Sequence, residues 1–271
     1  MLAYNHIAYL RNCKLEKFNK VIKFDNFKPK EKSLTEKELR IQLAAAYRIF
    51  NHLKWDYLIY GHITVRIPGP DKHFLINPFG LRYDEVTASN LVKIDLEGNI
   101  VEPSKYPVNP AGFVIHSAIH STRDDAHCVM HTHTPAGMAA AGLKNPIKNI
   151  DFDSASLTDR IAYHDFEGLT VREEECQRLS NNLGNKSVMI LRNHGLLSVG
   201  STVAHAFIRL HTLERACQVQ MLARSLNEEL IEVSDNIAKA HASELENSDN
   251  GELAFNAMMR LMEKIDPSFK D

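Results

Sequence analysis

The hydrophobic pattern of the chain switches repeatedly between the helical and the strand period, which predicts a mixed α/β fold. Apolar residues recur at helical spacing over residues 39–53. We expect this helix to begin with Ser33 as its N-cap, because Glu36 would complete a capping box. Further helices are predicted at 113–121, from Thr134 and Pro135 onward, at 173–183, at about 203–226, and in the charged C-terminal part.

Short apolar runs between these helices predict the strands. The first two strands, at 63–67 and 74–76, flank a Pro-Gly-Pro turn. Further strands are predicted as a hairpin of 91–94 and 100–101, as a run ending at His131, and at 188–191 and 196–199. Strands and helices that alternate within one unit imply an α/β sandwich.

Composition divides the chain into three predicted regions. Residues 1–38 form a lysine-rich N-terminal arm, for which a solvated segment and a contact with a partner subunit are both open interpretations. Residues 39–225 carry the strand and helix pattern of the main domain. Residues 226–271 form a helical C-terminal extension, which we expect to pack on a neighbouring subunit.

Charge and composition narrow the class of protein. The 271 residues are 44% hydrophobic and carry a net charge of −2, so no overall field favours nucleic acid. The four cysteines form no Cys-x-x-Cys motif, which indicates free thiols in a reducing compartment. The chain shows no signal segment and no apolar run of the roughly 18 residues that a membrane span requires. We therefore expect a cytoplasmic protein with no membrane or nucleic-acid partner.

Three histidines form the strongest candidate for a functional site. His131 and His133 are two apart on a predicted strand, so both side chains point to one face. His194 follows the buried strand at 188–191, and the fold can bring it to the same place. Three neutral imidazoles with an open position are typical of a catalytic divalent metal site. Imidazole ligands suit zinc first, with manganese, iron, cobalt or nickel as alternatives.

Other polar residues are weaker candidates for this chemistry. His116 and His120 share a predicted helical face, but no glutamate lies between them as in a zinc protease motif. We expect His116 to pack beside the site. The segment 163–168, Tyr-His-Asp-Phe-Glu-Gly, is either a source of a general acid or base or a simple turn.

Four motifs resemble the class II aldolase/adducin family, over about residues 39–225. They are Gly61-His62-Ile63-Thr64, Ile76-Asn77-Pro78-Phe79-Gly80, His131-Thr132-His133-Thr134-Pro135-Ala136-Gly137 and Leu191-Arg192-Asn193-His194-Gly195-Leu196. The stretch from Asn109 to Phe113, with His116-Ser117-Ala118-Ile119 after it, resembles the adducin-like branch most.

This resemblance implies a three-layer α/β/α sandwich around a mostly antiparallel sheet. It also implies a metal-dependent enzyme acting on a small molecule, often as a homo-oligomer and specifically a tetramer. By resemblance, His131, His133 and His194 are the metal ligands. Two turns would line the substrate site, through Gly61, Thr64, Asn77 and Gly80.

The sequence departs from the aldolases of this family at the expected catalytic carboxylate. Those enzymes carry Pro-Ser-Ser-Glu or Pro-Ser-Ser-Asp where this chain has residues 109–112, so the acidic residue is Gly112 here. The asparagine of their Gly-Asn-Ile-Ser turn is His62. Both changes remove groups that aldol cleavage uses. Decarboxylation needs less, because loss of CO2 forms an enolate without abstraction of a C–H proton.

Two functions follow as hypotheses. The first is a metal-dependent carbon–carbon lyase that cleaves or decarboxylates a small oxo or hydroxy acid or a sugar derivative, with Tyr163, Glu167 or His62 as the proton donor. The second is a non-catalytic, adducin-like binding or scaffold module of the actin-cytoskeleton type, since a fold does not fix a function. Retention of all three histidines favours the enzyme.

Overall fold

The structure is a computed structural model that describes residues 34–144, 147–168, 173–246 and 251–271. The predicted N-cap Ser33 and most of the lysine-rich arm lie outside these ranges. The described residues belong to one compact unit, which includes the C-terminal extension.

Seven strands form one sheet in the order β3-β2-β1-β4-β7-β6-β5. Their bounds are β1 His62–Arg66, β2 Phe74–Ile76, β3 Val92–Ile94, β4 Cys128–Thr132, β5 Ile161–His164, β6 Val188–Leu191 and β7 Gly195–Gly200. Only β5 and β6 pair in parallel within this sheet, and each other neighbouring pair is antiparallel. The mostly antiparallel sheet that the resemblance implied is therefore confirmed.

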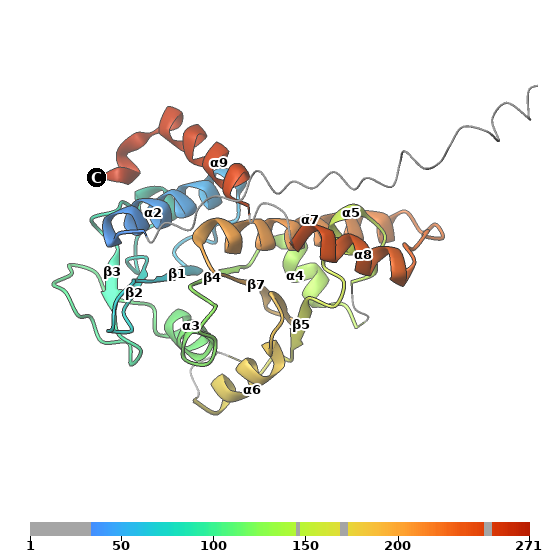
Figure 1. Ribbon diagram of the computed structural model, residues 1–271, viewed down its shortest axis with the longest axis horizontal. Helices are drawn as coiled ribbons and strands as arrows, with labels where there is room; N and C mark the ends of the chain where they lie inside the picture. Colours follow the sequence, from blue (N-terminus) through green and yellow to red (C-terminus); the bar gives the residue numbers. More distant parts are fainter. Residues whose placement is uncertain (1–33, 145–146, 169–172, 247–250) are drawn as a thin grey trace, which may run out of the picture. The chain divides into compact units, whose positions relative to one another are not determined.

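Helices cover both faces of the sheet (Figure 1). Their bounds are α2 Glu36–Leu53, α3 Pro110–Thr122, α4 Pro135–Ala141, α5 Phe152–Ser156, α6 Glu173–Leu183, α7 Val203–Ser225, α8 Asp235–Glu246 and α9 Glu252–Ile265, with short 3-10 turns η3 at Tyr83–Glu85 and η4 at Pro267–Lys270. Helices α3 and α6 lie on one side, and α2, α4 and α7 lie on the other (Figure 1). The fold is the expected three-layer α/β/α sandwich.

Side-chain alternation along the strands divides the core into two layers. On β4, Cys128 and Met130 join the cluster that contains α2 and α7. Val129, between them, joins the cluster that contains α3 and α6. Because successive residues of a strand point to opposite faces, His131 belongs to the α3 side of the sheet. All five residues of β4 are buried, so this orientation is fixed by packing.

The prediction of Ser33 as N-cap is wrong, because α2 begins two residues later. Thr35 is the cap: its hydroxyl accepts from the Glu38 backbone, and the Glu38 carboxylate accepts from the Thr35 backbone. With this start, Leu34 and Leu39 occupy the positions that form a hydrophobic staple, and both pack on the core. A start at Ser33 would place Lys32 before the cap and form no such pair.

The C-terminal extension packs on the core of its own chain. Phe255 and Met262 of α9, and Phe269 of η4, are buried in the core cluster that contains α2 and α7. The Arg48 guanidinium of α2 also pairs with the Asp266 carboxylate at 2.7 Å. The expected contact with a neighbouring subunit stays a prediction for the exposed side of this segment.

Two local predictions differ from the structure. The hairpin expected at 91–101 is reduced to β3 and one isolated bridge between Ile94 and Ile100. Residues 161–164, which we interpreted in part as a turn, form the edge strand β5. The strand pairs with β6, so its short alternating pattern is supported by tertiary contacts.

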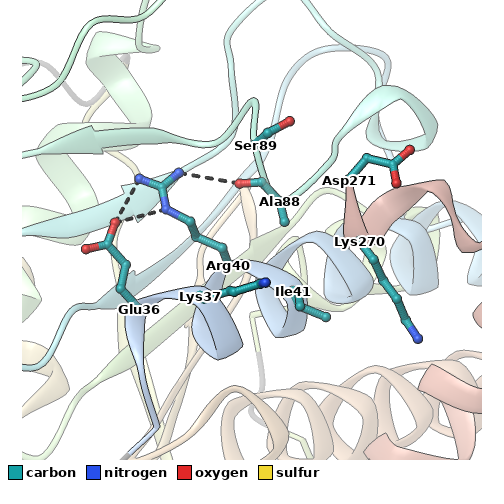
Figure 2. Close-up of a pocket in the computed structure, with 8 residues that line it drawn as sticks. All are labelled: Glu36, Lys37, Arg40, Ile41, Ala88, Ser89, Lys270 and Asp271. Carbon is teal, nitrogen blue, oxygen red and sulfur yellow. Dashed lines mark hydrogen bonds and ion pairs between the residues drawn. The ribbon is translucent and has the colours of Figure 1, made fainter.

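A cleft lies where α2 begins, beside the C-terminal η4 (Figure 2). The Arg40 guanidinium donates to the Glu36 carboxylate and to the Ala88 carbonyl there (Figure 2). None of the candidate histidines lines this cleft.

In the described ranges, no helix is both long enough and apolar enough to cross a membrane.

Candidate metal centre

The fold brings the three predicted histidines together. His131 lies on β4, His133 directly after it, and His194 in the turn between β6 and β7. One ring nitrogen from each lies within 4.8 Å of the other two. The Nε2 atoms of His131 and His133 are 2.7 Å apart. His131 is buried, whereas the other two rings are partly exposed, so the cluster is accessible from one side.

The strand pairing fixes the orientation of His131. Its Nδ1 lies 2.8 Å from the Leu196 carbonyl oxygen on β7. A carbonyl oxygen only accepts, so Nδ1 carries the proton and Nε2 keeps its lone pair for a ligand. Hydrogen bonds of this kind commonly orient metal-bound histidines. The donor set therefore fits a divalent metal.

Gly195 makes the close approach of β7 to this cluster possible. A Cβ at position 195 would lie 2.2 Å from the Thr132 carbonyl oxygen and 3.0 Å from Cδ2 of His133. Any other residue would push the two strands apart. The preceding turn holds Asn193 at a positive φ of 56°, which asparagine tolerates better than most residues.

Burial keeps the imidazoles neutral. It lowers the pKa of His131 well below the usual value, and the neighbouring His194 and His133 lower it further. Burial, followed by His133 and His164, lowers the pKa of His194 to about 4. Burial also lowers the pKa of His133. A metal ion needs neutral imidazole, so these shifts favour metal binding at neutral pH.

His62, a predicted catalytic residue, lies beside the cluster. It pairs directly with His131 across β1 and β4, and the two ring centroids are 5.1 Å apart. Its ring occupies the space above Gly112, where a Cβ would lie 2.4 Å from the His62 Cδ2. The imidazole of His62 thus fills the place of a side chain at position 112.

The predicted substrate-binding residues separate into two groups. Gly61 is buried directly before His62, at a φ of 107°, and a Cβ there would lie 2.6 Å from the Tyr83 hydroxyl, whereas Gly80 is exposed in an open turn at a φ of 106°. Thr64 is 1% exposed, with its hydroxyl between His116 and His120, and Asn77 is 2% exposed, with its side-chain oxygen bound by Tyr47. The latter two side chains make internal contacts in the structure.

Tyr163 is not brought to the histidines. It packs with the core cluster on the α2 and α7 side, and its hydroxyl accepts from the Ile147 backbone at 3.1 Å. The Arg192 guanidinium lies 4.8 Å from its ring centroid. The neighbouring His164 instead contacts Asn182 of α6, on the opposite face. The structure therefore does not bring Tyr163 together with the three histidines.

Glu167 lies on the His194 side of the centre. Its carboxylate accepts from Arg178 at 2.8 and 2.5 Å and lies 4.0 Å from Nε2 of His164. Glu167, His164 and His194 line one small cavity together with Glu175. The buried Glu175 carboxylate is 3.7 Å from the His164 ring.

Two aromatic residues beside the cluster were not predicted. The ring of Tyr57 lies 5.6 Å from His133, and the ring of Phe166 lies 6.3 Å from His194. Both are more than half exposed, at 51% and 57%. Phe166 belongs to the segment 163–168 that the sequence singled out, whereas no local pattern distinguishes Tyr57.

The sheet, its two helical layers and the histidine cluster define the class of protein. Residues 41–221 match the model of the class II aldolase and adducin N-terminal domain. The chain belongs to the class II aldolase/adducin family. It is 50% identical over 189 residues to alpha-adducin of Mus musculus, covering 69% of this chain and 26% of that protein.

Two solved structures extend the similarity to most of the chain. An aldolase II superfamily protein from Pseudomonas syringae is 43% identical, with a TM-score of 0.84 over 89% of this chain and 98% of that one. An L-fuculose 1-phosphate aldolase from Glaciozyma antarctica is 31% identical, with a TM-score of 0.79 over 90% of this chain and 97% of that one.

Proposed function

We propose that this chain is a metal-dependent carbon–carbon lyase that cleaves or decarboxylates a small oxo or hydroxy acid or a sugar derivative. His131, His133 and His194 hold the divalent metal, zinc first. The observation that carries the proposal is the convergence of these three rings, one of them oriented by a backbone carbonyl. The similarity to an L-fuculose 1-phosphate aldolase supports lyase chemistry.

The neutrality of the donor set favours an anionic substrate. Three imidazoles leave the charge of a divalent ion uncompensated, and position 112 supplies no carboxylate. An ion held there would act as a Lewis acid toward an oxygen that gains negative charge. A carboxylate next to a carbonyl or hydroxyl group matches such a centre better than a neutral sugar does.

The absence of a carboxylate base at position 112 favours decarboxylation over simple aldol cleavage. Loss of CO2 from a 3-oxo acid breaks the C–C bond and leaves the electron pair on the product as an enolate. No base has to remove a proton in that step, and the product then takes up one proton at carbon. Glu167, which shares a small cavity with His194, is the group that we propose for this protonation.

The test is a substrate screen with the zinc-loaded protein. We expect CO2 or aldehyde release from some member of a panel of oxo acids, hydroxy acids and sugar phosphates. His133→Ala is expected to lower the rate about 100-fold or more, because it removes a ligand. His127→Ala, at an exposed histidine directly before β4, serves as the matched control. No turnover across the panel, or equal rates for the two variants, contradicts the proposal.

A second candidate function rests on the 50% identity to alpha-adducin. In this alternative, the chain is an adducin-like binding module of the cytoskeletal type without catalysis. Co-sedimentation with actin filaments separates the two. Binding that is equal for the wild type and His133→Ala, with no turnover in the screen, favours the module.

We also propose that the chain acts as a homo-oligomer, and specifically a tetramer. Several exposed apolar side chains lie near the centre, which is unusual for a surface that faces only water. They include Tyr57, Leu58, Tyr60 and Phe166. Light scattering coupled to size-exclusion chromatography measures the mass, and a monomer at micromolar concentration contradicts this part of the proposal.

A further inference from the structure

Four buried polar side chains form a series between α3 and β1 that leads to the candidate metal centre. His120 lies at one end, followed by Thr64, His116 and His62, and each is at most 4% exposed. The Thr64 oxygen is 2.7 Å from Nε2 of His120 and 2.7 Å from Nδ1 of His116. Nε2 of His116 is 2.8 Å from Nδ1 of His62.

A backbone carbonyl fixes the direction of every hydrogen bond in this series. Nδ1 of His120 is 2.8 Å from the Ala126 carbonyl oxygen, which can only accept. A neutral His120 therefore has a proton on Nδ1 and a bare Nε2, which accepts from the Thr64 hydroxyl. The Thr64 oxygen then accepts from Nδ1 of His116, whose bare Nε2 accepts from Nδ1 of His62.

The series requires neutral rings, and burial provides this condition. Burial lowers the pKa of His120 to about 3. It lowers the pKa of His116 well below its usual value, with a further decrease from the neighbouring His120. Reversal of the series would leave the bare Nδ1 of His120 facing the lone pairs of the Ala126 carbonyl. Only one direction is therefore compatible with these contacts.

The last nitrogen of the series is free to bind a ligand. Nε2 of His62 has no hydrogen-bond partner within the described part of the chain, since the contact of this ring with His116 is made by Nδ1. The ring itself is 4% exposed and lies next to His131. The site thus contains a lone pair on Nε2 of His62 next to the three histidines. The hydrogen bond from Nδ1 to His116 holds the ring in this orientation.

We propose that His120, Thr64 and His116 are positioning residues, which hold His62 in the Nδ1–H tautomer so that its Nε2 accepts a hydrogen bond from a substrate hydroxyl group. The substrate class is then a small acid that carries a hydroxyl beside its carboxylate. This inference rests on the proposed function, since it requires a small acid at the centre. The direction of the series itself does not depend on the metal.

The first test reads the tautomer directly. In protein labelled with 15N-histidine, NMR distinguishes protonated from bare ring nitrogens, and the spectrum of His62→Asn identifies the His62 signals. We expect a protonated Nδ1 and a bare Nε2 in the wild type and in Thr64→Ser, which keeps the hydroxyl. Thr64→Val is expected to give a mixture of tautomers. An unchanged His62 spectrum in Thr64→Val overturns the proposal.

Thr132→Val is the matched control. Thr132 is a buried strand threonine 2% exposed, and its hydroxyl finds no partner in the part of the chain that is described. Its side chain faces away from α3, because it is adjacent to His131 on β4. We expect this variant to keep the wild-type His62 spectrum. A change as large as that of Thr64→Val shows a general packing effect and contradicts the proposal.

The second test uses glycolate and acetate as probes of the zinc-loaded protein, because they differ by one hydroxyl group. We expect glycolate to bind about tenfold more tightly than acetate in the wild type, and the ratio to approach one in Thr64→Val. An equal ratio in both proteins overturns the role of the series. Failure of the wild type to bind zinc instead refutes the proposed function, and the tautomer test still decides the direction of the series.

Discussion

Gly112 and His62 are far apart in the sequence but share one small volume beside the metal centre. The ring of His62 fills the space that a side chain at 112 would need. The two departures from the family pattern, at positions 62 and 112, are therefore complementary. Gly112 lacks the carboxylate of the aldolases, and the imidazole of His62 on β1 occupies the space of that side chain. We expect the two positions to tolerate substitution only together.

Gly112→Ala tests this complementarity. The added methyl group would lie 2.4 Å from Cδ2 of His62, so the ring must move away from the cluster. We expect a loss of about 1–3 kcal/mol in the free energy of unfolding, measured by urea denaturation. Gly142→Ala is the control, because its Cβ would have no neighbour closer than 3.5 Å. Equal stability of the two variants contradicts the close contact.

Individual site residues differ in how far sequence alone predicts them. His131 and His133 were predictable because strand alternation is local, and the family motif supplied His194. The position of Tyr163 was not predictable, because residues 163–168 were treated as one loop, whereas β5 turns Tyr163 and His164 to opposite faces. The contact of His62 with Gly112 requires the docking of α3 on β1, which no local pattern encodes.

At the scale of elements, α4 links the metal centre to the core. The Thr134 hydroxyl accepts from the Gly137 backbone, which caps α4 directly after His133. The same hydroxyl donates to the Glu214 carboxylate of α7 at 2.5 Å, and Glu214 is 2% exposed. One side chain therefore both begins the helix and satisfies a buried carboxylate.

Thr134→Ala is expected to destabilise the protein by about 2–4 kcal/mol, because it removes the cap and one partner of a buried charge. Thr35→Ala removes the exposed cap of α2 and should cost only about 1 kcal/mol. Thermal or urea denaturation of both variants measures the difference. A loss no larger for Thr134→Ala than for Thr35→Ala contradicts the role of Glu214.

Long helices and buried strands were predicted well because their hydrophobic patterns are strong. The start of α2 was not, because Ser33 with Glu36 and Thr35 with Glu38 offer equivalent capping boxes. The staple of Leu34 and Leu39 decides between them through tertiary packing. The short β5 is stabilised by its pairing with β6, which a local pattern does not contain.

For the whole molecule, buried neutral histidines couple stability to pH. Burial places the pKa of His116 well below its unfolded value of about 6.5, and that of His120 at about 3. Below pH 6.5 the unfolded chain therefore binds protons that the folded chain does not. Because the unfolded state is then favoured, stability is complete above the unfolded pKa and falls as the pH decreases toward the folded pKa.

We expect the free energy of unfolding of the metal-free protein to decrease between about pH 7.5 and about pH 5.5. Each such histidine contributes up to about 1.4 kcal/mol per pH unit below its unfolded pKa. Urea denaturation at the two pH values measures the change. Equal stability at both values contradicts neutral burial of these rings.

The order of the sheet and the return of α9 to the core are properties of the whole chain. Sequence patterns predicted a sandwich, and the family resemblance supplied its three layers. Neither indicated that residues 252–270 would cover α2, because the same amphipathic pattern suits an interface between subunits. The candidate metal site is likewise a property of the assembled fold, since β4 and the turn after β6 supply its three histidines together.

The most direct test of the account is a calorimetric titration of the metal-free protein with zinc. We predict that the wild type and His127→Ala each bind one equivalent of zinc tightly. We predict that His133→Ala binds zinc with an affinity lower by about 100-fold or more. A wild type that takes up no zinc, or a His133→Ala variant that binds it as tightly as the wild type, would contradict the account.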